Sequence, residues 1–245
     1  MKIIGVIPAR YESSRLPGKP LADICGKPMI WWVYQNAIRI TRLDQVFVAT
    51  DDERIMDKCQ EMNIACLLTS KSHPTGSDRV SEVANRLDGD IYVTIQGDEP
   101  LLEESTINKV IDILVDNPDI TCATLKTAFR NPVDVVNRST PKVVCDVNDN
   151  MMLISRAEIP YPHKSLNYIF YKPIGTYAFT ADAIKLYGTL ERGPIELAED
   201  SELIRFIEHG IAVKVGMVDS ETIAVDTEKD LERVREIIMA RCGQA

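Results

Sequence analysis

Short apolar runs rich in β-branched residues alternate, over the first half of the chain, with longer stretches whose apolar residues recur every three or four positions. The short runs predict strands buried on both faces of a sheet, and the longer stretches predict amphipathic helices. The predicted strands are 3–7, 46–49, 64–68, 91–95 and 121–125, and the predicted helices are 28–38, 53–62, 78–87 and 103–115. This alternation predicts an α/β fold with a mostly parallel sheet and helices on both faces.

The rhythm changes over 131–180, an irregular stretch that contains a predicted hairpin around Asn148-Asp149-Asn150. The elements predicted here and beyond are strands at 142–147, 151–155, 174–179 and 212–218, and helices at 182–190, 195–209 and 227–241. We expect one domain over 1–245, in which 131–180 is an irregular sub-region that serves as a sub-domain or a dimer contact.

Composition narrows the class of protein. The net charge is −9 over 245 residues, the opposite of the balance expected of a non-specific nucleic-acid binder, so we expect no nucleic-acid partner. No run of about 18 apolar residues predicts a membrane span, and Met1-Lys2 leads straight into a strand rather than a signal sequence. The six cysteines lack C-x-x-C spacing and the three histidines are scattered, which predicts free thiols in a reducing cytoplasm and no zinc site.

A basic loop follows the first predicted strand, which ends at Pro8 because proline cannot donate to a strand ladder. Arg10, Arg15 and Lys19 lie within ten residues of one another, with serines and a glycine between them and one glutamate opposing. Open α/β sheets place anionic ligands at the carboxyl ends of their strands, which favours an anion-binding loop over an ordinary solvated one. A charge contact at 4 Å is worth roughly 4 kcal/mol at an effective dielectric constant near 20. A partly enclosed basic loop can therefore hold a nucleoside triphosphate in an acidic protein.

Two acidic residues follow other apolar runs. Asp98 lies in Gln96-Gly97-Asp98-Glu99-Pro100 after the fourth strand, and Asp226 follows Ala224-Val225. Facing a basic loop, such carboxylates suit a Mg²⁺ ion that bridges protein and phosphate oxygens. Taken alone, Asp98 is also typical of a turn or a helix cap, and Asp226 of the N-cap of the last helix. Neither GxGxxG nor GxxxxGKS/T occurs, so neither a dinucleotide-binding motif nor a P-loop is predicted.

A third stretch, His73-Pro74-Thr75-Gly76-Ser77-Asp78-Arg79, marks a turn from strand to helix. Its hydroxyls and backbone amides can contact a base edge or a phosphate, with help from Arg79. Plain capping of the helix by Asp78 explains the same residues equally well.

Motifs spread over nearly the whole chain carry a resemblance to a known family. They are Ile7-Pro8-Ala9-Arg10, Ser14-Arg15-Leu16-Pro17-Gly18-Lys19-Pro20-Leu21, Gly26-Lys27-Pro28-Met29-Ile30, Ala49-Thr50-Asp51, Thr75-Gly76-Ser77-Asp78-Arg79, Gln96-Gly97-Asp98-Glu99-Pro100, Lys142-Val143-Val144, Ile154-Ser155-Arg156, Gly175-Thr176-Tyr177 and Val225-Asp226-Thr227. In this order they resemble the CMP-Kdo synthetases, the 3-deoxy-manno-octulosonate cytidylyltransferases.

The resemblance implies a Rossmann-like fold of the nucleotide-diphospho-sugar transferase type and a homodimer built around the irregular middle region. It implies a reaction that joins CTP to a 3-deoxy-2-ulosonic acid and releases pyrophosphate, for lipopolysaccharide or capsule synthesis. Mg²⁺ on Asp98 and Asp226 would polarise the α-phosphate, while the loop cations spread the charge of the triphosphate.

The resemblance also implies roles for individual residues. The catalytic set is Arg10, Arg15, Lys19 and Asp98, and the nucleotide-binding set is Pro8, Ala9, Arg10, Ser14, Arg15, Lys19, Thr75, Gly76, Ser77, Arg79 and Asp98. The sugar-binding set is Gln96, Arg156, Tyr177, Glu199 and Glu202. Within it, Arg156 would pair with the carboxylate of the sugar.

The sequence departs from the family pattern on the sugar side. Lys172 lies where the family has a histidine before the Gly-x-Tyr strand, and Leu203 replaces the family's glutamine. A missing hydrogen-bond partner in a buried site shifts substrate preference strongly, so Kdo, an amino-substituted Kdo and another nonulosonate-like acid all stay open. Two other classes stay open as well. One is a nucleotidyltransferase for a sugar or polyol phosphate, with Lys142, Arg156 and Lys172 as acceptor cations; the other is a silent nucleotide-binding protein.

Overall fold

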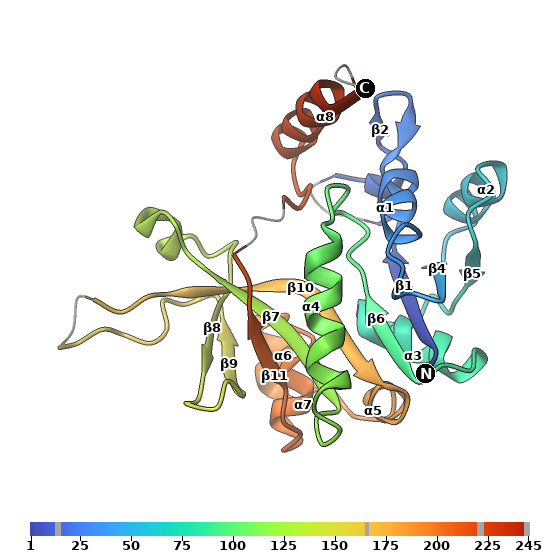
Figure 1. Ribbon diagram of the computed structural model, residues 1–245. Helices are drawn as coiled ribbons and strands as arrows, with labels where there is room; N and C mark the ends of the chain where they lie inside the picture. Colours follow the sequence, from blue (N-terminus) through green and yellow to red (C-terminus); the bar gives the residue numbers. More distant parts are fainter. Residues whose placement is uncertain (13–15, 165–166, 220–222, 243–245) are drawn as a thin grey trace.

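The fold is built on a seven-stranded sheet (Figure 1). The computed structural model describes residues 1–12, 16–164, 167–219 and 223–242. The strands run in the order β11-β7-β10-β6-β1-β4-β5, in which β10 is antiparallel to both neighbours and the other pairings are parallel. Their bounds are β1 (Ile3–Ala9), β4 (Gln45–Thr50), β5 (Cys66–Leu68), β6 (Ile91–Thr94), β7 (Cys122–Ala128), β10 (Tyr171–Thr180) and β11 (Lys214–Met217). The predicted mostly parallel α/β sheet is confirmed.

Helices cover both faces of the sheet, as predicted. Two cores result: α1, α2 and α4 pack on one face, and α3, α5 and α7 on the other, while α8 joins the first core and contacts the segment Asp23–Ile24. Their bounds are α1 (Met29–Ala37), α2 (Glu53–Glu61), α3 (Gly76–Arg86), α4 (Glu104–Val115), α5 (Ala181–Tyr187), α7 (Ile204–Glu208) and α8 (Glu228–Cys242). Among the described residues, no helix combines the length and the apolar character needed to cross a membrane.

Strand β1 explains how the two cores are joined. Its side chains alternate, so that Ile3 and Ile7 pack into one core while Ile4 and Val6 pack into the other. All four are at most 4% exposed, and each such side chain contributes about 1.5–3 kcal/mol to folding. The strand is therefore fixed on both faces, which holds the loop that follows it at a defined place on the sheet edge.

The stretch 131–180 divides into parts that behave differently. β8 (Lys142–Cys145) and β9 (Met151–Ser155) form the predicted antiparallel hairpin apart from the main sheet, whereas β10 belongs to that sheet. The chain between β9 and β10 extends away from the sheet as an arm (Figure 1). The remaining short elements are the 3-10 helices η1 (Lys19–Leu21) and η2 (Pro132–Val136) and the strand pair β2 (Asp23–Ile24) and β3 (Lys27–Pro28).

The predicted single helix over 195–209 is wrong. The chain forms α6 (Pro194–Glu199) and then α7, and Asp200 separates them with φ 51° and ψ 52°. This left-handed conformation ends a right-handed helix. The connection between α6 and α7 consequently turns toward the end of α3, where it contributes side chains to the site described below.

Two helix N-caps show whether Asp78 and Asp226 are capping residues. Thr75 caps α3: its Oγ1 accepts from Asp78 N at 3.2 Å, and Asp78 Oδ2 accepts from Thr75 N at 3.2 Å. Asp78 is therefore the third residue of a capping box rather than the cap itself. Thr227 caps α8 in the same way with Asp230, as predicted. This cap leaves the carboxylate of Asp226 outside the helix terminus.

Candidate active site

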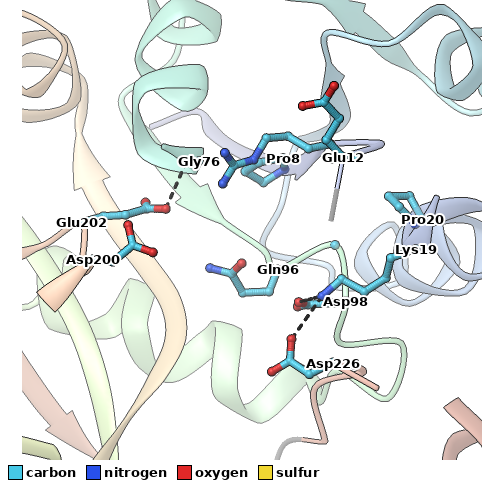
Figure 2. Close-up of a pocket in the computed structure, with 13 residues that line it drawn as sticks. Pro8, Glu12, Lys19, Pro20, Gly76, Gln96, Asp98, Asp200, Glu202 and Asp226 are labelled. Carbon is cyan, nitrogen blue, oxygen red and sulfur yellow. Dashed lines mark hydrogen bonds and ion pairs between the residues drawn. The ribbon is translucent and has the colours of Figure 1, made fainter. Parts of the chain in front are cut away.

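A cavity of about 380 Å³ opens at the carboxyl ends of β1 and β6 (Figure 2). Gly97 closes the gap between the two strand ends, because a Cβ there would lie 2.8 Å from the carbonyl oxygen of Pro8. The residues that line the cavity are Pro8, Ala9, Arg10, Glu12, Lys19, Pro20, Gly76, Gln96, Gly97, Asp98, Asp200, Glu202 and Asp226.

One ion-pair cluster occupies one side of this cavity. Lys19 Nζ lies 2.6 Å from Asp98 Oδ2 and 3.3 Å from Asp226 Oδ1. Lys19 opens η1, and Gly18 before it adopts φ 69°, a left-handed conformation that suits glycine. The loop of β1, the loop of β6 and the approach to α8 thus meet at one point. The predicted proximity of the two carboxylates and the basic loop is confirmed, while the catalytic and metal-binding roles stay predictions.

A backbone hydrogen bond brings the second carboxylate to the cavity. Val225 N donates to the carbonyl oxygen of Asp98 at 2.9 Å, and the side chain of Val225 is fully buried. The next amide, Asp226 N, donates to Asp230 Oδ2 at 3.2 Å. Because the backbone is held on both sides, the Asp226 side chain turns toward Lys19.

The other loop cation described by the structure is Arg10. Its Nη1 donates to the carbonyl oxygen of Pro74 at 3.3 Å, and its side chain lies between the main cavity and a second hollow. Ser14 and Arg15, which the resemblance places in the nucleotide site, lie outside the described residues.

The second hollow measures about 460 Å³ and shares Arg10 and Glu12 with the main cavity. Its other lining residues are Tyr11, Asp51, Asp52, Lys71 and His73. The Arg54 guanidinium lies 3.3 Å from the centre of the Tyr11 ring, and its hydrogen bonds lower the pKa of the Asp52 carboxyl. Sequence reasoning did not assign these lining residues, although Asp51 follows the second predicted strand just as Asp98 follows the fourth.

The Thr75–Arg79 stretch contributes less to the cavity than expected, since only Gly76 lines it. Thr75 is engaged in the α3 cap, and Ser77 Oγ donates to Glu202 Oε2 at 2.5 Å. Arg79 is fully buried, donates to Thr69 Oγ1 and lies 3.1 Å from Asp51 Oδ2. The structure therefore does not place the side chains of Thr75, Ser77 and Arg79 on the cavity wall.

Glu202 reaches the cavity from the α6–α7 connection and binds the first turn of α3. Its Oε1 accepts from Gly76 N at 3.0 Å, and its Oε2 accepts from Ser77 N at 2.9 Å. These amides would otherwise lack partners at the helix terminus, and a carboxylate there is favoured by the helix dipole. Glu202 lines the predicted sugar side, but its carboxylate is already engaged by α3.

An ion-pair network behind this wall fixes the α6–α7 connection. Arg205 is 1% exposed and donates to Asp78 Oδ1 at 2.6 Å and to Glu196 Oε1 at 2.8 Å. Burial opposes the charge of Arg205, but the hydrogen bonds that it donates to Glu196 and Asp78 outweigh this effect and raise its pKa. Because removing one partner of a buried pair leaves an uncompensated charge, this network holds Glu202 and its neighbours in place.

Gln96 is the sugar-side residue that the structure places centrally in the cavity (Figure 2). Its Nε2 donates to the carbonyl oxygen of Gly175 at 2.7 Å, and a Cβ on Gly175 would lie 2.7 Å from Gln96 Cγ. Glycine at 175 is thus required for the amide to approach. Tyr177, by contrast, is not among the lining residues, and burial, with a further contribution from Glu202, raises its pKa.

Arg156 and Glu199 lie away from the cavity in the described structure. Glu199 accepts from Ser155 Oγ at 2.5 Å and from Arg156 N at 2.8 Å. The Arg156 guanidinium donates to backbone carbonyl oxygens, among them that of Glu199 at 3.2 Å. These two predicted sugar-binding residues therefore join α6 to the end of β9 instead of lining the cavity.

One buried acid lies directly beside Asp98. Glu99 is 5% exposed, and burial together with the charge of Asp98 raises its pKa to about 8. Its Oε2 has no hydrogen-bond partner in the described residues. Burial beside Asp98 therefore disfavours the charged form of Glu99.

The carboxylates fit a hard divalent cation with an incomplete protein shell. Asp98 and Asp226 converge on Lys19 Nζ, and no third His, Cys, Asp or Glu among the described residues completes a metal-binding group with them. Mg²⁺ usually binds through one or two carboxylates and keeps waters and substrate phosphates as its other ligands. The donor set thus matches an ion delivered together with a phosphate ligand.

Comparisons with known proteins give a consistent result. A family model described as cytidylyltransferase matches residues 4–240. A 3-deoxy-manno-octulosonate cytidylyltransferase of Fusobacterium nucleatum is 42% identical over 96% of both chains, and one of Solibacter usitatus is 38% identical over 98% of this chain and 95% of that one. A solved CMP:2-keto-3-deoxy-manno-octonic acid synthetase complexed with CTP superposes with a TM-score of 0.92 at 37% identity, covering 98% of this chain and all of that one.

Proposed function

Because the chain belongs to the cytidylyltransferase family, and to its 3-deoxy-manno-octulosonate branch, we propose that it transfers CMP from CTP to a 3-deoxy-2-ulosonic acid, Kdo or a close analogue. The C2 hydroxyl oxygen of the sugar forms a bond to the α-phosphorus, the bond from that phosphorus to the β-phosphate oxygen breaks, and pyrophosphate leaves. The hydroxyl proton is released to solvent. The convergence of Lys19, Asp98 and Asp226 on one cavity wall is the observation that carries this proposal.

The cations act on the charge that the triphosphate brings. Arg10 and Lys19 line the cavity from the loop after β1, and the sequence places Arg15 between them. Fixed positive groups at this edge stabilise the charge that develops on the leaving pyrophosphate and need no reorganisation during the reaction. Lys19 gives up part of its contact with the two aspartates when phosphate oxygens arrive.

We propose that Asp98 and Asp226 hold Mg²⁺, which when bound polarises the α-phosphate and shields the triphosphate charge. The two carboxylates would supply the protein ligands of this ion. Without a bound cation, Lys19 neutralises the charge of the two carboxylates, since both lie within 3.3 Å of its Nζ.

The cavity has two ends suited to different parts of the substrates. The cytidine lies toward Arg10 and the second hollow, where Asp51 and the carbonyl oxygen of Pro74 offer acceptors for an exocyclic amine. Gly76 allows close approach at the rim. The acceptor sugar lies on the opposite side, beside Gln96.

The wall near Gln96 bears on the alternative acceptor, a sugar or polyol phosphate. Such an acceptor needs cations on the sugar side, yet Asp200 and Glu202 are acidic. Lys142, a predicted acceptor cation, is fully buried and donates to the carbonyl oxygens of Asn137 and Arg156. The wall therefore favours an acceptor with hydroxyl groups over one with a second phosphate.

The test is an assay of pyrophosphate release from CTP and Mg²⁺ with a panel of acceptors, with the CMP-sugar identified by mass spectrometry. We expect turnover with Kdo or another 3-deoxy-2-ulosonic acid and none with sugar phosphates. Release of pyrophosphate with sugar phosphates alone would instead assign the protein to the second class of nucleotidyltransferase.

We further propose a homodimer that serves lipopolysaccharide or capsule synthesis in the cytoplasm. Exposed apolar side chains occur on the arm and on α6, including Tyr161, Ile169 and Leu197, and such groups favour a protein partner. Cys25, Cys59, Cys66, Cys122 and Cys145 are free thiols, as suits a reducing compartment. Light scattering after size exclusion should give twice the mass of one chain, and Leu197→Glu should lower it.

A further inference from the structure

The acidic wall of the cavity comes from the α6–α7 connection and carries Asp200 and Glu202 (Figure 2). Both carboxylate oxygens of Glu202 accept from the first turn of α3, at 3.0 Å from Gly76 N and 2.9 Å from Ser77 N. Glu202 therefore has little capacity left for a ligand. Asp200 is the acid on this wall whose side chain the protein leaves accessible.

The backbone of Asp200 is held while its carboxylate stays available. Asp200 N donates to the carbonyl oxygen of Glu196 at 2.8 Å, and the residue adopts φ 51°. A residue with a Cβ pays for this conformation, although aspartate tolerates it better than most. The side chain is 83% exposed and forms one long ion pair, in which its Oδ1 lies 3.7 Å from Arg192 Nη2. Asp200 thus contributes a largely exposed carboxylate to the cavity wall.

Charge then orients the acceptor. On the opposite side of Gln96, the cavity carries Lys19, and the proposed function places the reacting phosphate there. The carboxylate of an ulosonic acid is repelled by Asp200 and Glu202, so it turns away from this wall, and the hydroxyl-bearing tail of the sugar turns toward it. A carboxylate accepts strong hydrogen bonds from hydroxyl or ammonium groups.

We infer that Asp200 is a specificity-determining residue that binds the hydrogen-bond donors on the tail of the acceptor sugar. This inference rests on the proposed function and adds a residue that neither the family motifs nor the sequence pattern assigns. Gln96 contacts the sugar nearer its reacting end. Asp200 discriminates between acceptors by the length of the tail and by the hydrogen-bond donors that the tail carries.

The experiment compares wild type with Asp200→Ala on two acceptors. One is the eight-carbon 3-deoxy-octulosonate. The other is a six-carbon 3-deoxy-2-ulosonic acid, which keeps the carboxylate and the C2 hydroxyl but lacks the end of the tail. The six-carbon acid is used as a competing ligand. For the octulosonate we expect KM to rise ten- to one-hundredfold, as the loss of a charged hydrogen bond predicts, with kcat and the KM for CTP unchanged. The inhibition constant of the six-carbon acid should be the same for both proteins.

Two further variants separate the role of the carboxylate from that of the backbone. Asp200→Gly keeps the left-handed conformation without cost, and it should match Asp200→Ala if the carboxylate is what matters. Asp119→Ala removes an exposed acid that does not line the cavity and should match wild type. An octulosonate with a terminal amine shows which donor Asp200 binds. If Asp200→Ala raises KM more for this amine than for the hydroxyl acceptor, Asp200 binds an ammonium group; if the rise in KM is equal, Asp200 binds hydroxyl groups.

An unchanged KM for the octulosonate in Asp200→Ala, or equal losses on the eight- and six-carbon acids, would overturn the inference while leaving the proposed function standing. Absence of wild-type turnover with every ulosonic acid would overturn both. The wild-type rate therefore reports on the reaction, and the ratio of variant to wild type reports on Asp200.

Discussion

Val225 N donates to the carbonyl oxygen of Asp98 over 2.9 Å, and this bond sets the spacing of the site. It brings the loop after β6 against the segment that leads into α8, although 127 residues separate the two. The carboxylates of Asp98 and Asp226 consequently reach the same ammonium group of Lys19. The site is a product of tertiary structure, because none of its three loops carries more than one member of this cluster.

Asp98→Ala should abolish pyrophosphate release and leave the fold intact. The side chain faces the cavity and lies outside both hydrophobic cores, so its loss removes charge and metal binding without opening a core void. We expect at least a hundredfold fall in kcat/KM and little change in the unfolding midpoint. Asp119→Asn, an exposed acid away from the cavity, serves as the control. Normal turnover by Asp98→Ala would refute the metal assignment.

Chelation of divalent cations should stop turnover, and added Mg²⁺ should restore it. Asp226→Asn keeps the size of the side chain but weakens a ligand, so we expect its Mg²⁺ concentration for half-maximal rate to rise about tenfold, within the 10- to 100-fold range typical of changes at metal sites. The rate is measured across a Mg²⁺ titration at saturating CTP. Identical titration curves for the variant and wild type would exclude Asp226 as a ligand.

Glu202→Ala should destabilise the protein through α3. It removes the acceptor for Gly76 N, Ser77 N and Ser77 Oγ, and losing such a cap costs about 1–2 kcal/mol. Denaturant titration measures the free energy of unfolding, with Glu191→Ala as an exposed control. Unchanged stability combined with a large rise in the acceptor KM would restore the earlier interpretation of Glu202 as a sugar ligand.

Stability at alkaline pH should depend on Lys142. Burial lowers the pKa of this fully buried lysine below its ordinary value near 10.5. In the window between the lowered and the ordinary pKa, the unfolded chain binds more protons than the folded one, so the free energy of unfolding rises with pH there. Lys142→Met lacks this dependence. The difference in unfolding free energy, wild type minus variant, should therefore grow as the pH rises toward 10.5; a constant difference would contradict the assignment.

Gly97→Ala should impair both folding and catalysis. The added Cβ would lie 2.8 Å from the carbonyl oxygen of Pro8, which is backbone and cannot swing aside. Overpacking of this kind typically costs about 1–3 kcal/mol, and it shifts Asp98 relative to the β1 loop. Gly89→Ala is a comparison variant away from the cavity, because its Cβ would meet the side chains of Ile4 and Tyr92, at 2.8 Å and 3.2 Å, and no backbone atom. The unfolding midpoint and kcat are measured for both variants.

The sequence contained enough to predict the sheet and the catalytic edge. An apolar run such as that of β1 is typical of a strand that is buried on both faces of a sheet. Parallel strands bring their carboxyl ends to one edge of that sheet. Lys19, Asp98 and Asp226 each follow such a run or its loop, which is why their meeting was predictable. Gly97 and Gly175 belong to motifs whose order the family shares, and the structure gives each a steric reason.

The surroundings of the cavity were less predictable because their contacts are long-range ion pairs. Nothing in the local pattern shows that Arg79 is buried against Asp51, or that Arg205 pairs with Asp78 rather than with solvent. The break at Asp200 is equally hidden, since the apolar spacing continues across it as though one helix ran through. Ion pairs between residues far apart in the sequence engage some of the acidic side chains and leave others accessible to a ligand. One sequence does not reveal these pairs.

The bonds from Glu202 to α3 make the nucleotide rim and the acceptor wall one mechanical unit. A ligand that draws the α6–α7 connection inward also draws on the amides of Gly76 and Ser77. Occupancy of one half of the cavity is then thermodynamically linked to affinity in the other, and the linkage is reciprocal. CTP and the sugar acid should therefore change each other's affinity by the same factor.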